Sequence, residues 1–257
     1  MILSETKTLT RIHATQCQEF YENVKRNAES IGISVNDKKT QLLCLSAANS
    51  ADTKSYIRLK DGTKIESQET LKILGHHFGE SPDLDVNLNK LSIKFRSRIW
   101  ILRHLKKAGL PCEDLTKMYK CFLLNILDYT CVVYHPMINK TQAHRLEMLQ
   151  KAALKVIYGY KLLYAELLEI TDLETLADRR QRLTDSFILK TVEQETYYKE
   201  KWFPRHPFYH HDLCKELIFE EEYARTTRLY NAPIFYYRHR LNEIYDLSAE
   251  EEMTTRT

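Results

Sequence analysis

The chain has 257 residues, of which 43% are hydrophobic and 28% are charged, which is typical of a globular protein with one to three domains. The formal net charge of +3 is too small to indicate a nucleic-acid-binding protein by itself, so local clusters of charge have to decide that question. No apolar run approaches the roughly 20 residues of a membrane-spanning helix, and six cysteines without a Cys-x-x-Cys pair favour reduced thiols. We therefore expect an intracellular protein, nuclear or cytoplasmic, with no membrane partner.

The first eighty residues combine one helix with short strands. Apolar residues at helical spacing, among them Phe20 and Val24, predict a helix from about residue 8 to residue 30 that ends before Gly32. The Asp61-Gly62 pair between alternating segments predicts a hairpin. The strands are expected at residues 42–45, 56–59, 64–66 and 71–78. This part of the chain is thus predicted to form a helix with a small, partial antiparallel sheet.

The rest of the chain carries helical patterns without strands. The clearest helix runs from Asp83 to Gly109, with a regular apolar stripe made of Leu84, Leu88, Leu91, Phe95, Ile99, Leu102 and Leu105. Further helices are expected at residues 112–129, 141–158, 164–170 and 173–199. We therefore predict a mostly α-helical α+β fold. Its predicted parts are residues 1–80, a helical domain at 81–160, a C-terminal helical region at 161–247 and a disordered tail at 248–257.

The helix from Asp83 to Gly109 also carries the densest positive charge of the chain. It has no acidic residue between Asp85 and Glu113, and its basic residues are Lys90, Lys94, Arg96, Arg98, Arg103, Lys106 and Lys107. At about 100° per residue, Trp100 lies on one flank of the apolar stripe, surrounded by three of these cations. The three are Arg96, Arg103 and Lys107, whereas Lys90, Lys94 and Arg98 lie on the other flank.

This basic helix has two interpretations. Its cations can bind a nucleic-acid backbone by displacing condensed counterions, while the indole of Trp100 stacks on an unpaired base or a sugar. Alternatively, Trp100 packs against a neighbouring helix and the charged side chains are only solvated. The helix alone does not decide between the two.

The sequence offers no convincing site for a metal ion. Polymerases hold two metal ions between paired carboxylates, but the chain has no Asp-Asp pair, and Asp83 and Asp85 are better explained as helix-capping residues. Four residues have spacings that could ligate zinc: His206, His210, His211 and Cys214. A cluster of histidines packed among aromatic residues is the preferred explanation for them. We therefore expect no metal and no cofactor in this chain.

Several blocks of the sequence, taken in order, resemble the reverse transcriptases of non-LTR (LINE-type) retrotransposons. The first is the turn Gly-x-x-x-Asn-x-x-Lys-Thr at residues 32–40, followed by an apolar strand. The others are Lys-Ile-Leu-Gly at 72–75, Asn-Ile-Leu-Asp-Tyr at 125–129, Leu-Glu-x-x-Gln-x-x-Ala-Leu-Lys at 146–155, Leu-Ala-Asp-Arg-Arg at 176–180 and Arg-Leu-Tyr-Asn-Ala-Pro at 228–233. Lys155 stands where the family usually has Arg. The resemblance covers about residues 1–242.

The resemblance implies roles for the parts of the chain. Residues 1–80 would be the trailing part of the palm, and residues 81–160 the thumb, whose basic helix would hold an RNA/DNA template-primer. Leu74 and Gly75 would belong to the primer grip, and Lys39 would be a remnant of the nucleotide side of the active site. The fingers and the metal-binding aspartates of the family are missing, so magnesium is expected only for the intact enzyme.

These features leave three hypotheses for the function. In the first, the chain is a truncated, catalytically inactive reverse transcriptase remnant that binds nucleic acid weakly and without sequence preference through the thumb helix. In the second, it is a fragment of an active RNA-directed DNA polymerase whose Tyr- or Phe-x-Asp-Asp hairpin precedes Met1 in the real product. In the third, it is a helical interaction module that binds a protein or self-associates through exposed apolar surface.

Overall fold

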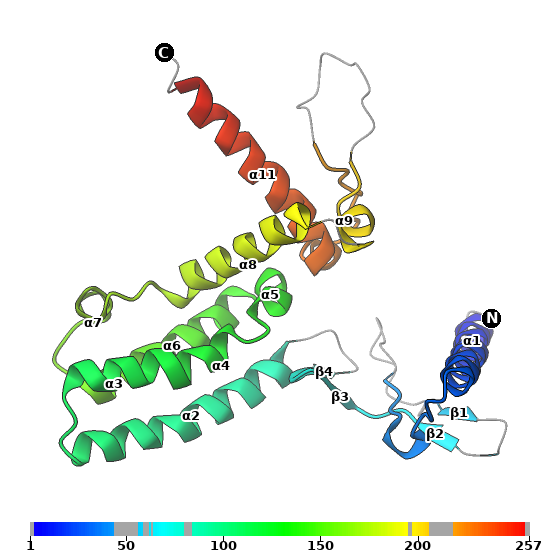
Figure 1. The fold of residues 1–257 in the computed structure, drawn as a ribbon, viewed down its shortest axis with the longest axis horizontal. Helices are drawn as coiled ribbons and strands as arrows, with labels where there is room; N and C mark the ends of the chain where they lie inside the picture. The colour runs from blue at the N-terminus through cyan, green and yellow to red at the C-terminus, as the bar shows by residue number, and fades with distance from the viewer. Residues whose placement is uncertain are drawn as a thin grey trace. The chain divides into compact units, whose positions relative to one another are not determined.

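The computed structural model describes residues 3–43, 56–58, 62, 64–79, 84–194, 197–205 and 218–254 (Figure 1). Two compact units divide the chain, Met1–Asn87 and Leu88–Thr257. The described residues are mostly helical, with two small antiparallel sheets of two strands each. The predicted α+β fold of mostly α-helical character is therefore confirmed. The finer predicted division at residue 160 stays a prediction.

The first unit contains a long helix and the predicted hairpin. Helix α1 spans Leu3–Ser30, and strands β1 (Tyr56–Arg58) and β2 (Lys64–Glu66) pair antiparallel. Ile57 and Ile65 lie opposite each other and are both buried, which explains why one face of this short hairpin is apolar. Of the expected strand at 42–45, Leu42 forms a parallel bridge with Ser67, and the part from residue 44 on lies outside the described residues.

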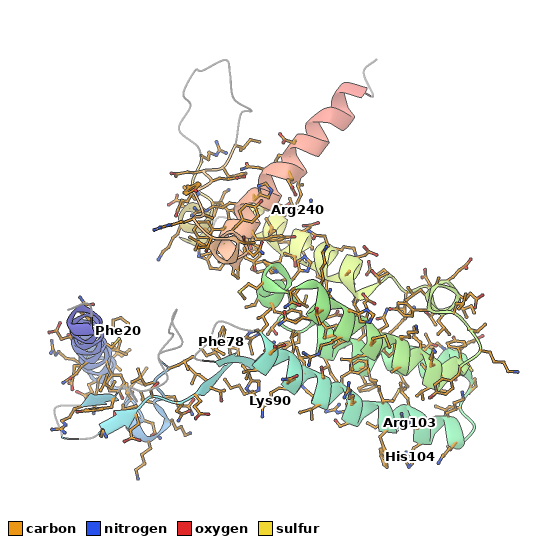
Figure 2. All side chains as sticks on the ribbon, turned by 180° about the vertical axis from the view of Figure 1, so that it is seen from behind. Phe20, Phe78, Lys90, Arg103, His104 and Arg240 are labelled. Atoms are coloured by element: carbon orange, nitrogen blue, oxygen red, sulfur yellow. The ribbon has the colours of Figure 1, made fainter. Side chains whose placement is uncertain are left out.

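Two of the apolar residues that predicted helix α1 are exposed. Phe20 (labelled in Figure 2) is 71% exposed and Val24 is 41% exposed. The face that packs on the first unit carries polar groups instead, because the Tyr21 hydroxyl donates to Asp37 Oδ1 over 2.5 Å and Lys25 donates to Asp37 Oδ2 over 2.9 Å. Asp37 begins the short 3-10 helix η1 (Asp37–Lys39). Hydrogen bonds to this turn, together with the packing of Tyr21 on Ile57 and Ile65, therefore orient α1.

The single strand expected at residues 71–78 is a second hairpin. Strands β3 (Thr70–Ile73) and β4 (His76–Gly79) pair antiparallel around a turn at Leu74 and Gly75, whose φ angles are 47° and 89°. Two successive positive φ angles are typical of a two-residue hairpin turn, because its twist matches that of the strands. A leucine is unusual in this conformation. The sequence therefore gave no sign of a turn at Leu74, and residues 71–78 were predicted as one continuous strand.

The described part of the second unit is mostly helical, with one isolated antiparallel bridge between Arg205 and Phe219. Its elements are α2 (Asp85–Lys107, whose first three residues belong to the first unit), α3 (Cys112–Met118), the π-helix η2 (Tyr119–Leu124), α4 (Asn125–Asp128), α5 (Cys131–Tyr134), η3 (His135–Met137), α6 (Lys140–Tyr158), α7 (Tyr164–Thr171), α8 (Leu176–Glu193), α9 (Tyr197–Trp202), α10 (Thr227–Tyr230) and α11 (Pro233–Thr254). Among the described residues, no helix combines the length and the apolar character that crossing a membrane requires.

The apolar stripe predicted for α2 is the face that packs into the second unit. Leu88, Phe95, Ile99 and Leu102 are all at most 4% exposed. The ring of Phe95 meets that of Tyr119 edge to face, with centroids 6.4 Å apart, so α2 packs on η2. This burial fixes the rotation of α2 about its own axis, and it thereby decides which of its side chains face solvent.

Two predicted helices are interrupted. The helix expected at 112–129 contains η2, in which the backbone follows a π-helix between α3 and α4. The helix expected at 173–199 begins at Leu176, with the Thr175 hydroxyl accepting from the Asp178 N–H, and ends at Glu193 before the separate α9. At the other end of the chain, α11 continues to Thr254, although a disordered tail was expected from residue 248.

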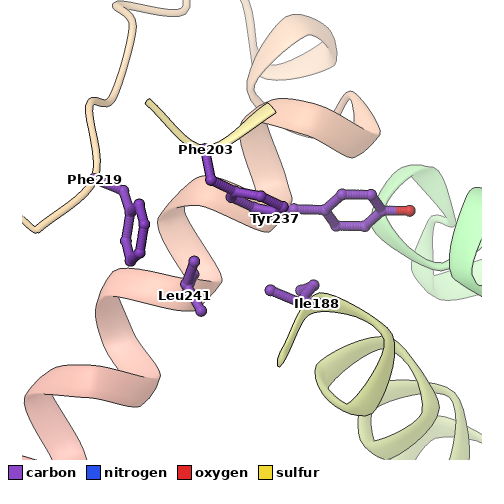
Figure 3. Close-up of a cluster of buried hydrophobic side chains, with 5 residues drawn as sticks. All are labelled: Ile188, Phe203, Phe219, Tyr237 and Leu241. Atoms are coloured by element: carbon purple, nitrogen blue, oxygen red, sulfur yellow. The ribbon is translucent and has the colours of Figure 1, made fainter. Parts of the chain in front are cut away.

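A separate apolar cluster joins the later helices of the second unit (Figure 3). Its buried members are Ile188 of α8, Phe203, Phe219, and Tyr237 and Leu241 of α11. Phe203 and Phe219 meet edge to face, and the Tyr237 hydroxyl donates to the carbonyl oxygen of Val132 over 2.6 Å. These aromatic and aliphatic residues therefore form the core that holds α11 against α8, and the Tyr237 hydroxyl ties α11 to α5.

Candidate nucleic-acid interface

Helix α2 presents Trp100 to solvent. Trp100 is 58% exposed. It is therefore not buried against a neighbouring helix, which was the alternative interpretation of the sequence. Arg96, Arg103 and Lys107 are exposed on the same flank of the helix. We call these four residues the Trp100 stripe. The buried opposite face of α2 holds the stripe in place, since rotating the helix would expose Phe95 and Leu102.

His104 completes the stripe, although its sequence context gave little reason to select it. Its ring lies against Trp100 in a tilted contact, with centroids 3.7 Å apart and an interplanar angle of 38°. Its Nδ1 lies 2.9 Å from the carbonyl oxygen of Trp100. A carbonyl oxygen can only accept, so Nδ1 carries the proton and donates. The spacing of four residues along a helix was the one signal for this contact.

The cations of α2 are mostly available to a ligand. Figure 2 labels Lys90 and Arg103 toward the two ends of the helix. Within the described part of the chain, no acidic side chain forms an ion pair with any of the six exposed cations, which are Lys90, Lys94, Arg96, Arg98, Arg103 and Lys107. They do not have to break an ion pair with the protein before they meet a phosphate.

Lys106 has a different role from the predicted one. Its ammonium donates to the carbonyl oxygens of Val156 and Ile157 over 2.9 and 2.7 Å. Both carbonyls belong to the last turn of α6, where carbonyl groups lack partners within the helix and the helix dipole places partial negative charge. Lys106 therefore caps α6, so its ammonium group is engaged within the protein and is not a candidate nucleic-acid contact.

The candidates of the first unit lie in turns. Leu74 is 85% exposed at the tip of the β3–β4 hairpin, with Gly75 beside it. Lys39 is exposed at the end of η1, beside an open hollow of about 950 Å³ lined by residues 35–38, 40 and 64–68. Lys39 itself does not line this hollow, which contains acidic as well as basic side chains. The structure thus gives Lys39 no surroundings selective for a phosphate.

Three of the sequence blocks that carried the resemblance meet in one polar network. Arg179 of α8 donates to both carboxylate oxygens of Asp128 of α4, with distances of 2.7 to 3.1 Å. Glu147 of α6 accepts from the Ala177 N–H over 2.9 Å and from the Tyr164 hydroxyl over 2.6 Å. Asp128, Glu147 and Arg179 belong to the blocks that resemble the reverse transcriptase family. In the structure their contacts join α4, α6 and α8.

A buried glutamine continues the same network. Gln150 is 1% exposed; its Oε1 accepts from the Tyr119 hydroxyl, and its Nε2 donates to the Tyr164 hydroxyl and to the Glu174 carbonyl oxygen. Burial raises the pKa of Tyr119, which keeps its phenol protonated as a donor. The Arg182 and Arg179 guanidinium groups lower the pKa of the Glu174 carboxyl. Every hydrogen-bonding atom of the Gln150 amide thus has a partner, so the network fixes one packing of these helices.

The structure adds no metal centre to these groups. Across the described ranges, His, Cys, Asp and Glu side chains do not gather in threes where they could hold a metal ion. His206, His210, His211 and Cys214 lie outside the described residues. The residues that are described do not fit the magnesium site of an intact polymerase, and we assign no step to a metal.

The chain was compared with protein-family models, with curated proteins and with solved structures, and none of them matches it.

Proposed function

We propose that this chain is the trailing palm and the thumb of a non-LTR reverse transcriptase, and that its Trp100 stripe binds the backbone of a nucleic acid. The observation that carries the binding proposal is the stripe itself, in which cations without ion-pair partners among the described residues surround an exposed indole on an acid-free helix face. The resemblance of the sequence blocks supplies the ligand class, an RNA/DNA template-primer.

The length of the stripe suits a nucleic-acid strand. From Arg96 to Lys107 the helix rises about 16 Å at 1.5 Å per residue. One strand of a duplex carries a phosphate about every 3.4 Å along the axis, so the stripe runs past about five phosphates. Three cations along this length release condensed counterions when they bind, which gives weak, salt-sensitive binding without sequence preference.

Binding is tested by charge reversal with a matched control. The triple variant Arg96→Glu, Arg103→Glu, Lys107→Glu changes the net charge from +3 to −3, because each substitution removes two charges. The control Arg26→Glu, Lys140→Glu, Lys190→Glu makes the same change at exposed cations elsewhere. Fluorescence polarisation of a labelled RNA–DNA hybrid at low salt should show at least a tenfold larger loss of affinity for the stripe variant. Equal losses, or no binding by the natural chain, would contradict the proposal.

We propose no polymerase activity for the chain alone. The described residues bring no pair of carboxylates to the stripe, and the proposed function needs only binding. A primer-extension assay with magnesium should therefore give no incorporation above background. Incorporation would favour the alternative that the chain works as part of an active RNA-directed DNA polymerase, and it would overturn the description of an inactive remnant.

A second candidate function, self-association, is favoured by the apolar residues exposed on the first unit. Phe20, Val24, Ile31 and Ile33 are between 41% and 72% exposed on α1 and the residues that follow it. Exposed apolar residues that gather in one segment are typical of surfaces that bind protein. If they mediate self-association, Phe20→Ser with Val24→Ser should lower the mass measured by light scattering at high concentration. If the natural chain and the double variant have the same mass at high concentration, this candidate is excluded.

A further inference from the structure

We infer that Trp100 stacks on an unpaired nucleobase, so the ligand of the stripe is a nucleic acid with a single-stranded segment. This inference rests on the proposed function and narrows it, because the cations alone would accept any phosphate backbone. The inference is about the role of the Trp100 indole, because a surface that binds phosphates by charge alone would not need an exposed aromatic ring.

The His104 ring makes Trp100 a pre-formed platform. It lies against the indole at 3.7 Å and is held there by the 2.9 Å hydrogen bond from its Nδ1 to the Trp100 carbonyl oxygen. One face of the indole is therefore covered by an aromatic ring, while 58% of the side chain remains exposed. A base that joins this stack extends it by one ring, and the protein loses little side-chain freedom because the first two rings are already in place.

Base pairing decides which nucleic acids can use this platform. Inside a duplex both faces of a base are occupied by its neighbours in the stack, so an indole on a helix surface cannot reach them. An unpaired base has a free face, and every base has one, which makes such stacking tolerant of sequence. A single strand, or the single-stranded template beyond a primer end, therefore fits the stripe better than a continuous duplex.

The flanking side chains place phosphates on both sides of the stacked base. Arg96 lies four residues before Trp100 and Arg103 three residues after it, so both neighbour the indole on the helix surface. Ile93 continues the same flank toward the start of α2 and is 65% exposed. It offers an apolar contact for the next sugar or base. The flank thus alternates cations with flat or apolar side chains, as surfaces that bind single strands do.

The test uses the fluorescence of Trp100. The chain has two tryptophans, and Trp202→Phe leaves Trp100 as the single indole. Unlabelled oligothymidylate of 12 nucleotides should quench this emission, whereas a blunt DNA duplex with a similar number of phosphates should bind without comparable quenching. Trp100→Ala should lower the affinity for the single strand by about tenfold, in the range of 1–3 kcal/mol per stacked base. It should change the affinity for the duplex by less than about twofold.

The controls separate this inference from the proposed function. Tyr223 is 90% exposed beside Glu222, so Tyr223→Ala removes an exposed aromatic ring from acidic surroundings and should not change single-strand affinity. Trp100→Phe should restore part of the affinity. One outcome refutes stacking alone: the natural chain binds both the single strand and the duplex, but neither ligand quenches Trp100. If the charge-reversal variant then loses affinity for both ligands, backbone binding still stands. If neither ligand binds to the natural chain, both proposals fail together.

Discussion

Lys106 and Lys107 are neighbours of the same residue type, and the structure gives them separate tasks. Lys106 turns toward the end of α6 and satisfies two of its carbonyl groups, whereas Lys107 is exposed on the Trp100 stripe. A change of one residue along a helix is a rotation of about 100°, enough to move a side chain from a contact to solvent.

Substitution of Lys106 should therefore affect stability, and substitution of Lys107 should affect binding. Lys106→Met removes the hydrogen bonds to Val156 and Ile157 and a cation at a helix C-terminus, and it should lower the free energy of unfolding by about 1–2 kcal/mol. Lys107→Met should change it by less than about 0.5 kcal/mol. Urea denaturation of both variants measures the difference, and equal values would contradict the cap.

His135 makes the stability of the second unit depend on pH. Burial lowers its pKa, and the nearby Arg180 and Arg240 guanidinium groups act in the same direction, against hydrogen bonding to Gln181 and the charge of Asp185. Its Nε2 donates to Gln181 Oε1 over 3.0 Å, and the Tyr236 hydroxyl lies 3.3 Å away. The folded chain thus favours the neutral ring more than the unfolded chain does.

The sign of the pH effect follows from this lowered pKa. Above the ordinary pKa of about 6.5 both states hold neutral His135, so its contribution to stability is complete. As the pH falls below that value, the unfolded chain takes up the proton first, and stability is lost down to the folded-state pKa. The melting temperature should fall more between pH 7.5 and 5.5 in the natural chain than in His135→Gln. His76, whose pKa burial also lowers, contributes equally to both proteins. Identical shifts would contradict this role.

At the scale of elements, the ion pair between Asp128 and Arg179 joins α4 to α8. Both side chains are about one-fifth exposed, and the pair is bidentate. Arg179→Met would leave the Asp128 carboxylate without this partner and should cost about 2–3 kcal/mol. Arg182→Met breaks a contact to Glu174 from a side chain that is 57% exposed, and should cost less than 1 kcal/mol. Thermal unfolding of both variants distinguishes a network that holds the helices from ordinary surface pairs.

The sequence predicted elements well where one period dominated. The stripe from Leu84 to Leu105 predicted α2 and its buried face, because burial of one face is what a period of 3.6 residues encodes. It did not predict the turn at Leu74 and Gly75, since a leucine with positive φ gives no turn signal. The spacing of Phe20 and Val24 correctly predicted a helix, but both residues are exposed, because apolar spacing states which residues share a face and not that the face is covered.

The candidate site, too, could be predicted only where the spacing of residues within one helix determines it. The flank that carries Trp100 follows from helical geometry alone, so four of its residues could be selected from the sequence. The cap formed by Lys106 could not, because its partners lie about fifty residues further along the chain. The network around Gln150 was visible only as a set of motifs, since tertiary packing decides which polar side chains meet.

At the scale of the whole molecule, the net charge of +3 should have little influence on binding compared with the stripe. Three cations on phosphates predict that log K for a single strand falls with log salt with a slope of about −2, at about 0.7 per contact. Arg103→Met should reduce the steepness by about 0.7, whereas Trp100→Ala should weaken binding and leave the slope unchanged. Titrations at salt concentrations between about 50 and 200 mM measure both the affinity and the slope. A change of slope in Trp100→Ala would contradict the separation of charge from stacking.

The π-helix η2 implies that the chain holds one residue more than its packing needs. Hydrogen bonds from i to i+5 give a turn one additional residue, while the flanking α3 and α4 keep their own faces buried. Deleting Phe122, which is 54% exposed, should therefore restore an ordinary helical turn and leave Asp128 facing Arg179, with a melting temperature close to that of the natural chain. Deleting the similarly exposed Met148 from the regular helix α6 should abolish folding, because every later residue of that helix would rotate by about 100°. Insertions and deletions in related chains should accordingly gather at η2, where the fold tolerates a change of length inside a helix.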